Sequence, residues 1–561
     1  MTNIYVRTRR GRCKTCFGNA EGTSGIHTSN HKMAVSTERR RLALVLALVL
    51  ALHVCVSAPV MAVEPKPTPS TLTSFFELFA DSNLIYDKAG RERYFHGTNV
   101  VYKEPPYHPS LSAFDSQFSF VAEDMSLMQS MGYSSIRLSV PWAAVEPSRG
   151  IYNTTYLSLM RSLVDQAGSY GISSLIDFHQ DAWAAPFCGN GVASWAAPPP
   201  ADPALGFPMP LAKPVPVDPR TGAPTRETCD QINGNDWSMF YLTYATSEAI
   251  GAVYDDVDGL RKAFAAYWGV VAKTFADSPH VIGYELMNEP FAGQVYKNPG
   301  LLVPGVADRE KLQPLYDQVA SAIREFDTSH LIFFQGVVWE VVLPVGEKHG
   351  FTDVPGGAAR WANKSVLAWH NSVLSGATPD DTYYAWKQSE MARLRCGGWV
   401  TETGDAQLDL LDKWQLSWMQ WDYKWFANRT YDVPGLFRLD PDDPYKPCVQ
   451  RTSMDACLNR DAVPTWSRTH AKAVAGKTQA FRYNSSTKVA TLRFVPDASI
   501  AEPTVLFVSH AWVYTGGFDV DVQPVGALTW SNTEDEDHLL FQLARLDAGG
   551  VNVTITVSPR K

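Results

Sequence analysis

Basic residues are scarce in this chain of 561 residues: 49 Lys and Arg face 58 Asp and Glu, and charged residues make up 19%. A protein that binds nucleic acid through phosphate contacts shows the opposite balance, so nucleic acid is excluded as the main partner. The chain also lacks a clustered set of metal ligands, a glycine-rich phosphate loop and the residue order of a Ser–His–Asp triad, so we expect no metal site and no cofactor. Aromatic residues, at 12%, and hydrophobic residues, at 45%, are plentiful instead. They exclude a wholly disordered chain and favour ligands that are neutral, ring-shaped or apolar.

Long hydrophobic runs are rare too, and the one exception is residues 42–56. Basic residues precede this run, and small residues follow it up to a cleavage site before Val63, a pattern typical of a secretory signal peptide. An uncleaved signal anchor is the alternative, because the stretch to Val63 approaches the roughly 20 residues that span a bilayer. We assign residues 1–62 to an N-terminal extension and signal, with Met33 as an alternative start, and 63–74 to a linker. The protein is expected to be secreted or in an endomembrane, lysosome-like lumen, or membrane-anchored if the signal stays.

Cysteine is the third scarce residue type, with 8 in the chain, three of them within the predicted extension and signal. Cys188 and Cys229 bracket a proline-rich segment, and Cys448 and Cys457 bracket a short polar loop. Each pair is a candidate disulfide in an exported protein, and Cys396 is then left over and expected to be buried. Sequons of the form N-x-S/T are candidate glycosylation sites in such a protein: Asn153, Asn363, Asn428, Asn484 and Asn552.

Residues 75–466 alternate short β-rich runs with longer amphipathic stretches. Eight strand signals separated by helical periods predict an α/β fold, a (β/α)8 TIM barrel. The expected strands are 94–99, 135–140, 173–178, 281–286, 331–335, 366–370, 398–401 and 416–421. Clear helical stretches between them are 122–131, 156–170, 259–275 and 312–326.

Two further regions stand apart from this alternation. A proline-rich insertion at 196–236 follows the third strand, so on a barrel it belongs to the catalytic face, as a surface loop that forms a lid or rim. Residues 467–561 alternate apolar and polar positions between turns, which predicts a C-terminal β-sandwich.

Two glutamates end two of the expected barrel strands. Glu289 lies in VIGYELMNEP after the fourth strand, and Glu402 lies in WVTETG after the seventh. Strand ends carry the chemistry of such barrels, so these carboxylates can face one another across the mouth. One carboxyl that protonates a leaving oxygen and one that attacks are what glycoside hydrolysis requires.

Together with Arg137 in IRLSVPW, the DFHQD stretch 177–181 and His370, this pair of glutamates resembles glycoside hydrolase family 5. The resemblance covers about residues 75–560. Within the family, the chain is similar to endoglycoceramidases and related glucosylceramidases through three longer motifs: NVVYKEPPYHP (99–109), RLSVPWAAVEP (137–147) and HQDAWAAPFCGNGVASWA (179–196).

The resemblance implies a role for each residue of the two catalytic motifs. Glu402 would be the nucleophile and Glu289 the acid/base of a double displacement with retention, a reaction that needs no cofactor. Arg137 would hold Glu402 ionised and aimed. Asn288 would bond the sugar 2-hydroxyl.

Further residues are expected to bind the sugar. His179 and His370 would shape the floor of the subsite that holds the reacting sugar. Lys103 and Asp181 lie in motifs that contact the glycan in the similar enzymes. Trp421 is expected to stack on the sugar; its neighbour Trp418 is the other tryptophan of this strand, and either could instead belong to the core.

The substrate implied by the resemblance is a glycosphingolipid, met at a membrane or micelle surface and cut between ceramide and either a glycan or a single glucose. Three alternatives stay open. One is a β-glucosidase acting on steryl or other lipid glucosides, another is a different β-glycanase of family 5, and the third is a catalytically inactive carbohydrate-binding surface protein. The sequence carries no signal for an oligomeric state.

Overall fold

The computed structural model describes residues 76–79, 83–211, 216–219, 223–233, 237–338, 349–371, 379–426, 435–440, 443–533, 537–545 and 549–561. The predicted signal and linker and the Asn428 sequon lie outside these residues. Within them, no helix is both long and apolar enough to cross a membrane.

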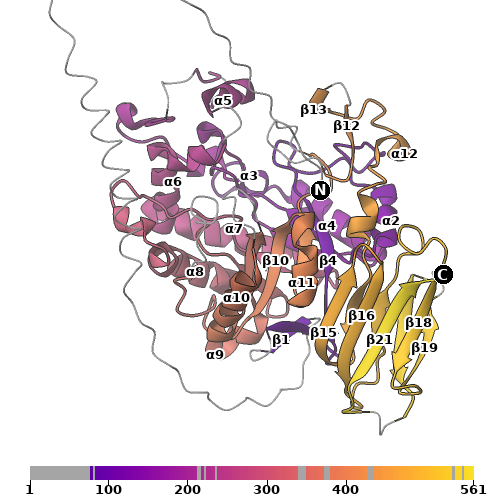
Figure 1. Cartoon of the computed structure of the whole chain (residues 1–561). Helices are drawn as coiled ribbons and strands as arrows, with labels where there is room; N and C mark the ends of the chain where they lie inside the picture. Colours follow the sequence, from indigo (N-terminus) through magenta and orange to yellow (C-terminus); the bar gives the residue numbers. More distant parts are fainter. Residues whose placement is uncertain are drawn as a thin grey trace, which may run out of the picture. The chain divides into compact units, whose positions relative to one another are not determined.

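Eight parallel strands close into a barrel in the order β10-β11-β4-β5-β6-β7-β8-β9 (Figure 1). Each predicted strand overlaps one barrel strand, so the expected (β/α)8 fold is confirmed. The strands are β4 (His96–Val100), β5 (Ser135–Ser139), β6 (Ser173–Asp177), β7 (Val281–Glu285), β8 (Leu331–Phe334), β9 (Ser365–Asn371), β10 (Gly397–Thr403) and β11 (Ser417–Gln420).

Helices cover the outside of this barrel, and the four predicted helical stretches correspond to α2, α4, α7 and α8. In α7 the large buried side chains Phe264, Tyr267, Trp268, Val271 and Phe275 recur three or four residues apart and form its core-facing side. The helices are α2 (Ala122–Ser130), α3 (Trp142–Val145), α4 (Thr154–Ser169), α5 (Arg226–Asn233), α6 (Tyr244–Tyr254), α7 (Leu260–Phe275), α8 (Gln313–Arg324), α9 (Ala358–Trp361), α10 (Asp381–Leu394), α11 (Leu408–Lys413), α12 (Met454–Cys457) and α13 (Val463–Trp466).

The C-terminal region consists of antiparallel sheets, as predicted. One has four strands in the order β15-β16-β21-β18, and the other has seven in the order β1-β2-β3-β14-β17-β20-β19. Their bounds are β1 (Phe76–Phe79), β2 (Leu84–Asp87), β3 (Glu92–Arg93), β14 (His470–Val474), β15 (Gly476–Asn484), β16 (Val489–Pro496), β17 (Thr504–Phe507), β18 (Phe518–Gln523), β19 (Leu528–Asn532), β20 (His538–Leu543) and β21 (Val553–Pro559). A short hairpin, β12 (Leu439–Asp440) and β13 (Asp443–Pro447), lies between barrel and sheets in the sequence.

The seven-stranded sheet contains strands that the sequence analysis assigned to the barrel region. Strand β3 pairs with β14, with Arg93 opposite Ala473, so residues before the first barrel strand extend the C-terminal sheet. This pairing joins strands that are far apart in the sequence. It could not be predicted, because each strand by itself has only the pattern of a short β-rich run. The domain boundaries 75–466 and 467–561 themselves stay a prediction.

Both predicted disulfides are present, Cys188–Cys229 and Cys448–Cys457, and Cys396 is free and buried as expected. Cys229 lies on helix α5, within the insertion that we expected to be a surface loop. The described part of the insertion thus has a helical segment held to the barrel chain by a covalent bond.

Candidate active site

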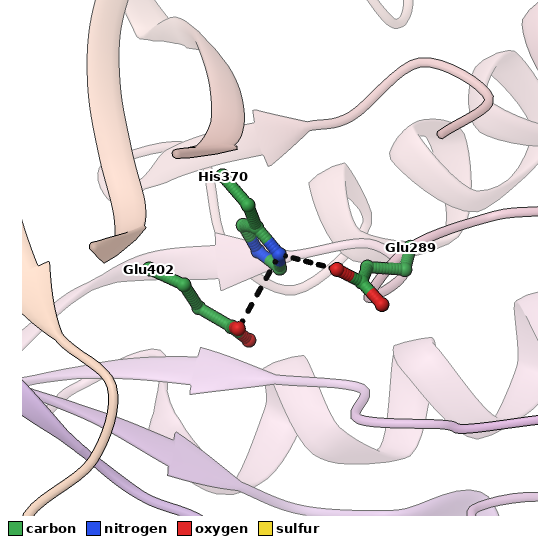
Figure 2. A group of neighbouring side chains, drawn as sticks. All are labelled: Glu289, His370 and Glu402. Carbon is green, nitrogen blue, oxygen red and sulfur yellow. Dashed lines mark hydrogen bonds and ion pairs between the residues drawn. The ribbon is translucent and has the colours of Figure 1, made fainter. Parts of the chain in front are cut away.

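Three side chains from three strands of the barrel meet at its mouth. Glu289 follows β7, His370 lies in β9 and Glu402 lies in β10. Figure 2 shows the His370 ring between the two carboxylates, with Nδ1 2.8 Å from Oε1 of Glu289 and 3.4 Å from Oε2 of Glu402. One oxygen of each glutamate and a ring nitrogen of His370 all lie within 4.8 Å of one another.

The separation of the two carboxylates decides what chemistry they can perform. Inverting glycosidases hold their carboxyl groups about 6.5–9.5 Å apart to admit a water molecule, whereas retaining enzymes hold them at about 5–5.5 Å. The closest oxygens of Glu289 and Glu402 lie within 4.8 Å, which fits the retaining arrangement. Among the described residues this trio is also the group whose donor atoms could hold a metal ion.

Arg137 in β5 is fully buried and organises the nucleophile side of the site. Its Nη1 donates to Oε1 of Glu402 at 2.7 Å, and its Nη2 donates to Oδ1 of Asn288 at 2.8 Å. One planar guanidinium therefore fixes both residues at once. It also contacts Glu285, Asp177 and Asn99 at 2.6, 3.1 and 3.2 Å, and its Nη1 lies 3.4 Å from Nδ1 of His179.

Charge within the site is balanced by pairing. Burial by itself would lower the pKa of Arg137, but its carboxylate neighbours outweigh that effect and raise it. Burial raises the pKa of Glu402, and the positive charges of His370 and Arg137 oppose that rise. Burial would also lower the pKa of His370, yet Glu402 and Glu289 raise it and favour the imidazolium. The net pKa of Glu402 lies above its ordinary value because burial outweighs its two cationic neighbours, which favour the carboxylate form.

A second group of side chains adjoins the first through His179. The His179 ring lies parallel to that of Trp421, with centroids 5.5 Å apart and an interplanar angle of 11°. Nζ of Lys103 lies 2.8 Å from Oδ2 of Asp181 and 4.8 Å from the Trp421 ring centroid. Nδ1 of His179 lies 3.0 Å from Asp177, and Nε2 lies 3.7 Å from Asp181.

The ionisation of this second group follows from those contacts. Burial disfavours the charged form of His179, but Asp181 and Asp177 outweigh it and raise its pKa to about 9. Burial would raise the pKa of Asp181, but Lys103 and His179 hold it well below its usual range. At neutral pH the group therefore presents two cations and an ionised carboxylate beside the indole of Trp421. Trp418, by contrast, is fully buried and packs on His96 in the core.

All nine predicted binding and catalytic residues are connected through the contacts above. Sequence reasoning missed the partners that hold them. Asp177 and Glu285 are fully buried acids that bind Arg137, and Thr401 donates to Oε1 of Glu285 at 3.0 Å. Gln180 and Gln335 bond the backbone of Glu289. The available signal was the presence of acidic residues inside otherwise apolar strands, since a buried carboxylate requires a partner.

Two family models match this chain: "Cellulase (glycosyl hydrolase family 5)" over residues 109–371 and "Glycoside hydrolase family 5 C-terminal domain" over residues 468–557. The endoglycoceramidase of Hydra vulgaris is 37% identical over 470 residues, which cover 82% of this chain and 86% of the relative. The chain belongs to glycoside hydrolase family 5. The endoglycoceramidase of Cyanea nozakii is 35% identical to this family 5 enzyme and covers 85% of it, with 92% of the relative matched.

Solved structures share the fold of this family 5 enzyme. Endo-glycoceramidase II from Rhodococcus sp., in complex with a five-membered iminocyclitol, superposes with a TM-score of 0.62 at 21% identity. The match covers 85% of this chain and 99% of that one. The same protein is also known as a lactosyl-enzyme intermediate, matched at a TM-score of 0.62 and 20% identity.

Proposed function

We propose that this family 5 enzyme is an endoglycoceramidase, a retaining β-glycosidase that cuts between the glycan and the ceramide of glycosphingolipids. The observation that carries the proposal is the Glu289–Glu402 pair, with oxygens within 4.8 Å at the mouth of the barrel. Relatives 35–37% identical over more than four-fifths of the chain bear the name endoglycoceramidase, which supports this substrate class.

In the first step Glu402 attacks the anomeric carbon of the sugar while Glu289 transfers its proton to the ceramide oxygen, and the glycosidic bond breaks. In the second step Glu289 takes a proton from water, and the oxygen of that water replaces Glu402 on the anomeric carbon. Arg137 keeps Glu402 ionised and oriented for the attack. Asn288, held by Arg137 at 2.8 Å, offers its amide to the 2-hydroxyl of the sugar.

His370 serves both carboxylates in this scheme. Its Nδ1 lies within 2.8 Å of Glu289 and 3.4 Å of Glu402, so one imidazolium stabilises whichever carboxylate is ionised in a given step. The glycan is bound by the second group: Trp421 stacks on a sugar ring, while Lys103, Asp181 and His179 supply charged hydrogen-bonding groups. Ceramide is insoluble in water, so the enzyme meets its substrate at a membrane or micelle surface.

The test is product analysis with a panel of lactose-based glycosphingolipids, glucosylceramide and steryl glucoside. The proposal expects intact oligosaccharide and ceramide from the first class. Release of glucose alone, from ceramide or sterol, would instead support a glucosylceramidase or steryl β-glucosidase. Activity confined to cellulose or mannan would reject every glycolipid substrate and support another β-glycanase of family 5. Binding of a glycan without turnover would support the catalytically inactive carbohydrate-binding protein.

Glutamine variants then test the roles of the two carboxylates. Glu402→Gln should reduce kcat by about 1,000-fold or more, since the nucleophile is lost. Glu289→Gln should reduce it by about 10²–10⁴-fold on ceramide substrates, the usual contribution of a general acid. Glu248→Gln, a change of the same kind at a residue paired with Lys297, is the matched control and should stay active.

We also propose that the enzyme is exported and glycosylated. Two disulfides and the apolar run at 42–56 support export. Asn153, Asn484 and Asn552 are exposed and therefore accessible to a glycosyltransferase. Expression in a secretory host followed by glycan removal should lower the apparent mass, and N-terminal sequencing of the product should begin near Val63. An unchanged mass would reject glycosylation.

A further inference from the structure

The backbone of Glu289 is held in an unusual conformation. Its φ is +39°, in the left-handed region that residues other than glycine rarely adopt. Such a residue persists where its surroundings hold it in place, and such positions gather at active sites. The hydrogen bonds that hold this peptide unit therefore also decide where the Glu289 carboxyl points.

Two glutamines hold the peptide of Glu289 from opposite sides. Oε1 of Gln335, directly after β8, accepts the N–H of Glu289 at 2.8 Å. Nε2 of Gln180, after β6, donates to the carbonyl oxygen of Glu289 at 3.0 Å and to that of Asn288 at 2.8 Å. Both glutamines are buried, with 0% and 2% of Gln180 and Gln335 exposed, so water does not compete for these bonds.

Each glutamine is itself fixed by a further residue. Oε1 of Gln180 accepts the N–H of Trp183, and its Nε2 also lies 3.0 Å from the hydroxyl of Tyr241 in the 3-10 helix Trp237–Leu242. The hydroxyl of Tyr316 in α8 donates to the backbone carbonyl of Gln335 at 2.9 Å. The two bonds on Glu289 are therefore anchored by helix α8 and by the 3-10 helix that follows the insertion.

The carboxyl group of Glu289 has fewer side-chain partners than the carboxyl group of Glu402. Arg137 and His370 both contact the carboxylate of Glu402. The carboxyl of Glu289 is hydrogen-bonded to His370 among the described residues. A group that must release and recover a proton benefits from free oxygens, so its direction has to come from the backbone.

We propose that Gln180 and Gln335 are positioning residues that aim the acid/base at the glycosidic oxygen through the peptide of Glu289. This inference rests on the proposed role of Glu289 and extends it to residues that touch neither substrate nor the reacting atoms. The same amide of Gln180 also bonds the backbone of Asn288. Gln180 therefore positions both the residue that binds the sugar 2-hydroxyl and the acid/base Glu289. Loss of either glutamine lets the Glu289 peptide relax away from its left-handed conformation.

A comparison of leaving groups tests this proposal. Gln180→Met and Gln335→Met replace each amide by an apolar side chain of similar length. Their kcat/KM is measured on two substrates with the same glycan, one linked to ceramide and one to 2,4-dinitrophenol. Ceramide needs a proton to leave, whereas dinitrophenolate does not. Each variant should lose about 10- to 100-fold on the ceramide substrate. Gln335→Met should lose less than about threefold on the dinitrophenyl substrate, whereas Gln180→Met should lose more there, though still less than on ceramide, because it also frees Asn288.

Two further variants separate the possible failures. Glu289→Gln must show the same leaving-group contrast at larger size; if it does not, the proposed acid/base is wrong. If it does, but the methionine variants lose both activities equally or lose neither, the positioning role is overturned. Gln313→Met is the matched control, because Gln313 is buried and hydrogen-bonded to Asp317 and Asp353. If Gln180→Met fails to fold, Gln335→Met decides alone.

Discussion

The disulfide between Cys188 and Cys229 should contribute more to stability than the one between Cys448 and Cys457. The bonds close loops of 41 and 9 residues. The loop-entropy relation assigns about 4 kcal/mol at 25 °C to the longer loop and about 2.6 kcal/mol to the shorter. Removing both cysteines of each pair should therefore lower the free energy of unfolding by amounts that differ by about 1.4 kcal/mol.

The assay is denaturant unfolding followed by tryptophan fluorescence, with Cys188→Ala/Cys229→Ala compared with Cys448→Ala/Cys457→Ala. In the folded protein burial raises the pKa of the remaining thiol, Cys396, to about 12, and running the assay at about pH 6 keeps this thiol protonated in the unfolded chain too, so that it does not exchange with the disulfides. Equal losses in the two double variants, or a greater loss in the second, would refute the loop-entropy reasoning.

The longer disulfide also has a predicted effect on activity. The bond lies in a small buried cluster with Phe240, the residue before Tyr241, whose hydroxyl lies 3.0 Å from Nε2 of Gln180. Cys188→Ala/Cys229→Ala should therefore reduce kcat on ceramide substrates, whereas Cys448→Ala/Cys457→Ala should not. Full activity in the first variant would show that this disulfide does not support Gln180 through Tyr241.

Three further changes test the charges of the site and of the barrel. Arg137→Lys keeps the charge but not the planar donors, so kcat/KM should fall by about 100-fold, and the acid limb of its pH profile should move to higher pH because Glu402 loses a partner. The pKa of His179 is raised to about 9, so its contribution to stability is complete below about pH 6.5 and is lost as the pH rises through 9; His179→Gln should flatten that decline in the measured unfolding free energy. Burial raises the pKa of Asp412 to about 6, so its ionisation lowers stability between about pH 4 and 6, and melting curves of Asp412→Asn should lack that decline.

The barrel strands were predictable because each one is a short β-rich run that is buried at nearly every position. Strand β7 is buried at every position, and its sequence VIGYE ends shortly before a proline that stops extension. The catalytic candidates were predictable for a related reason. Glu289 and Glu402 follow two such strands, and the topology of a parallel barrel brings every strand end to one face.

The pairing of β3 with β14 was not predictable, because strand pairing depends on partners far apart in the chain. The contacts of the two glutamines that hold Glu289 were not predictable either, because they also join residues far apart in the chain. Gln180 and Gln335 follow different strands, and neither has a neighbour in sequence that reveals a contact with Glu289. Their role follows from the backbone conformation of Glu289, with a φ of +39°, and this conformation cannot be predicted from the residue type.

By itself, the sequence determined the barrel and the two disulfide pairs and predicted the nine candidate residues of the site, because each depends on local β-rich patterns, on few cysteines or on motifs at strand ends. The tertiary structure alone decided how those residues act together. Only it brings the oxygens of Glu289 and Glu402 within 4.8 Å, places His370 between them and gathers Asp177, Glu285 and Glu402 around Arg137. Such distances and such a balance of charges arise only when the strands close into a barrel, so they cannot be predicted from any single segment of the sequence.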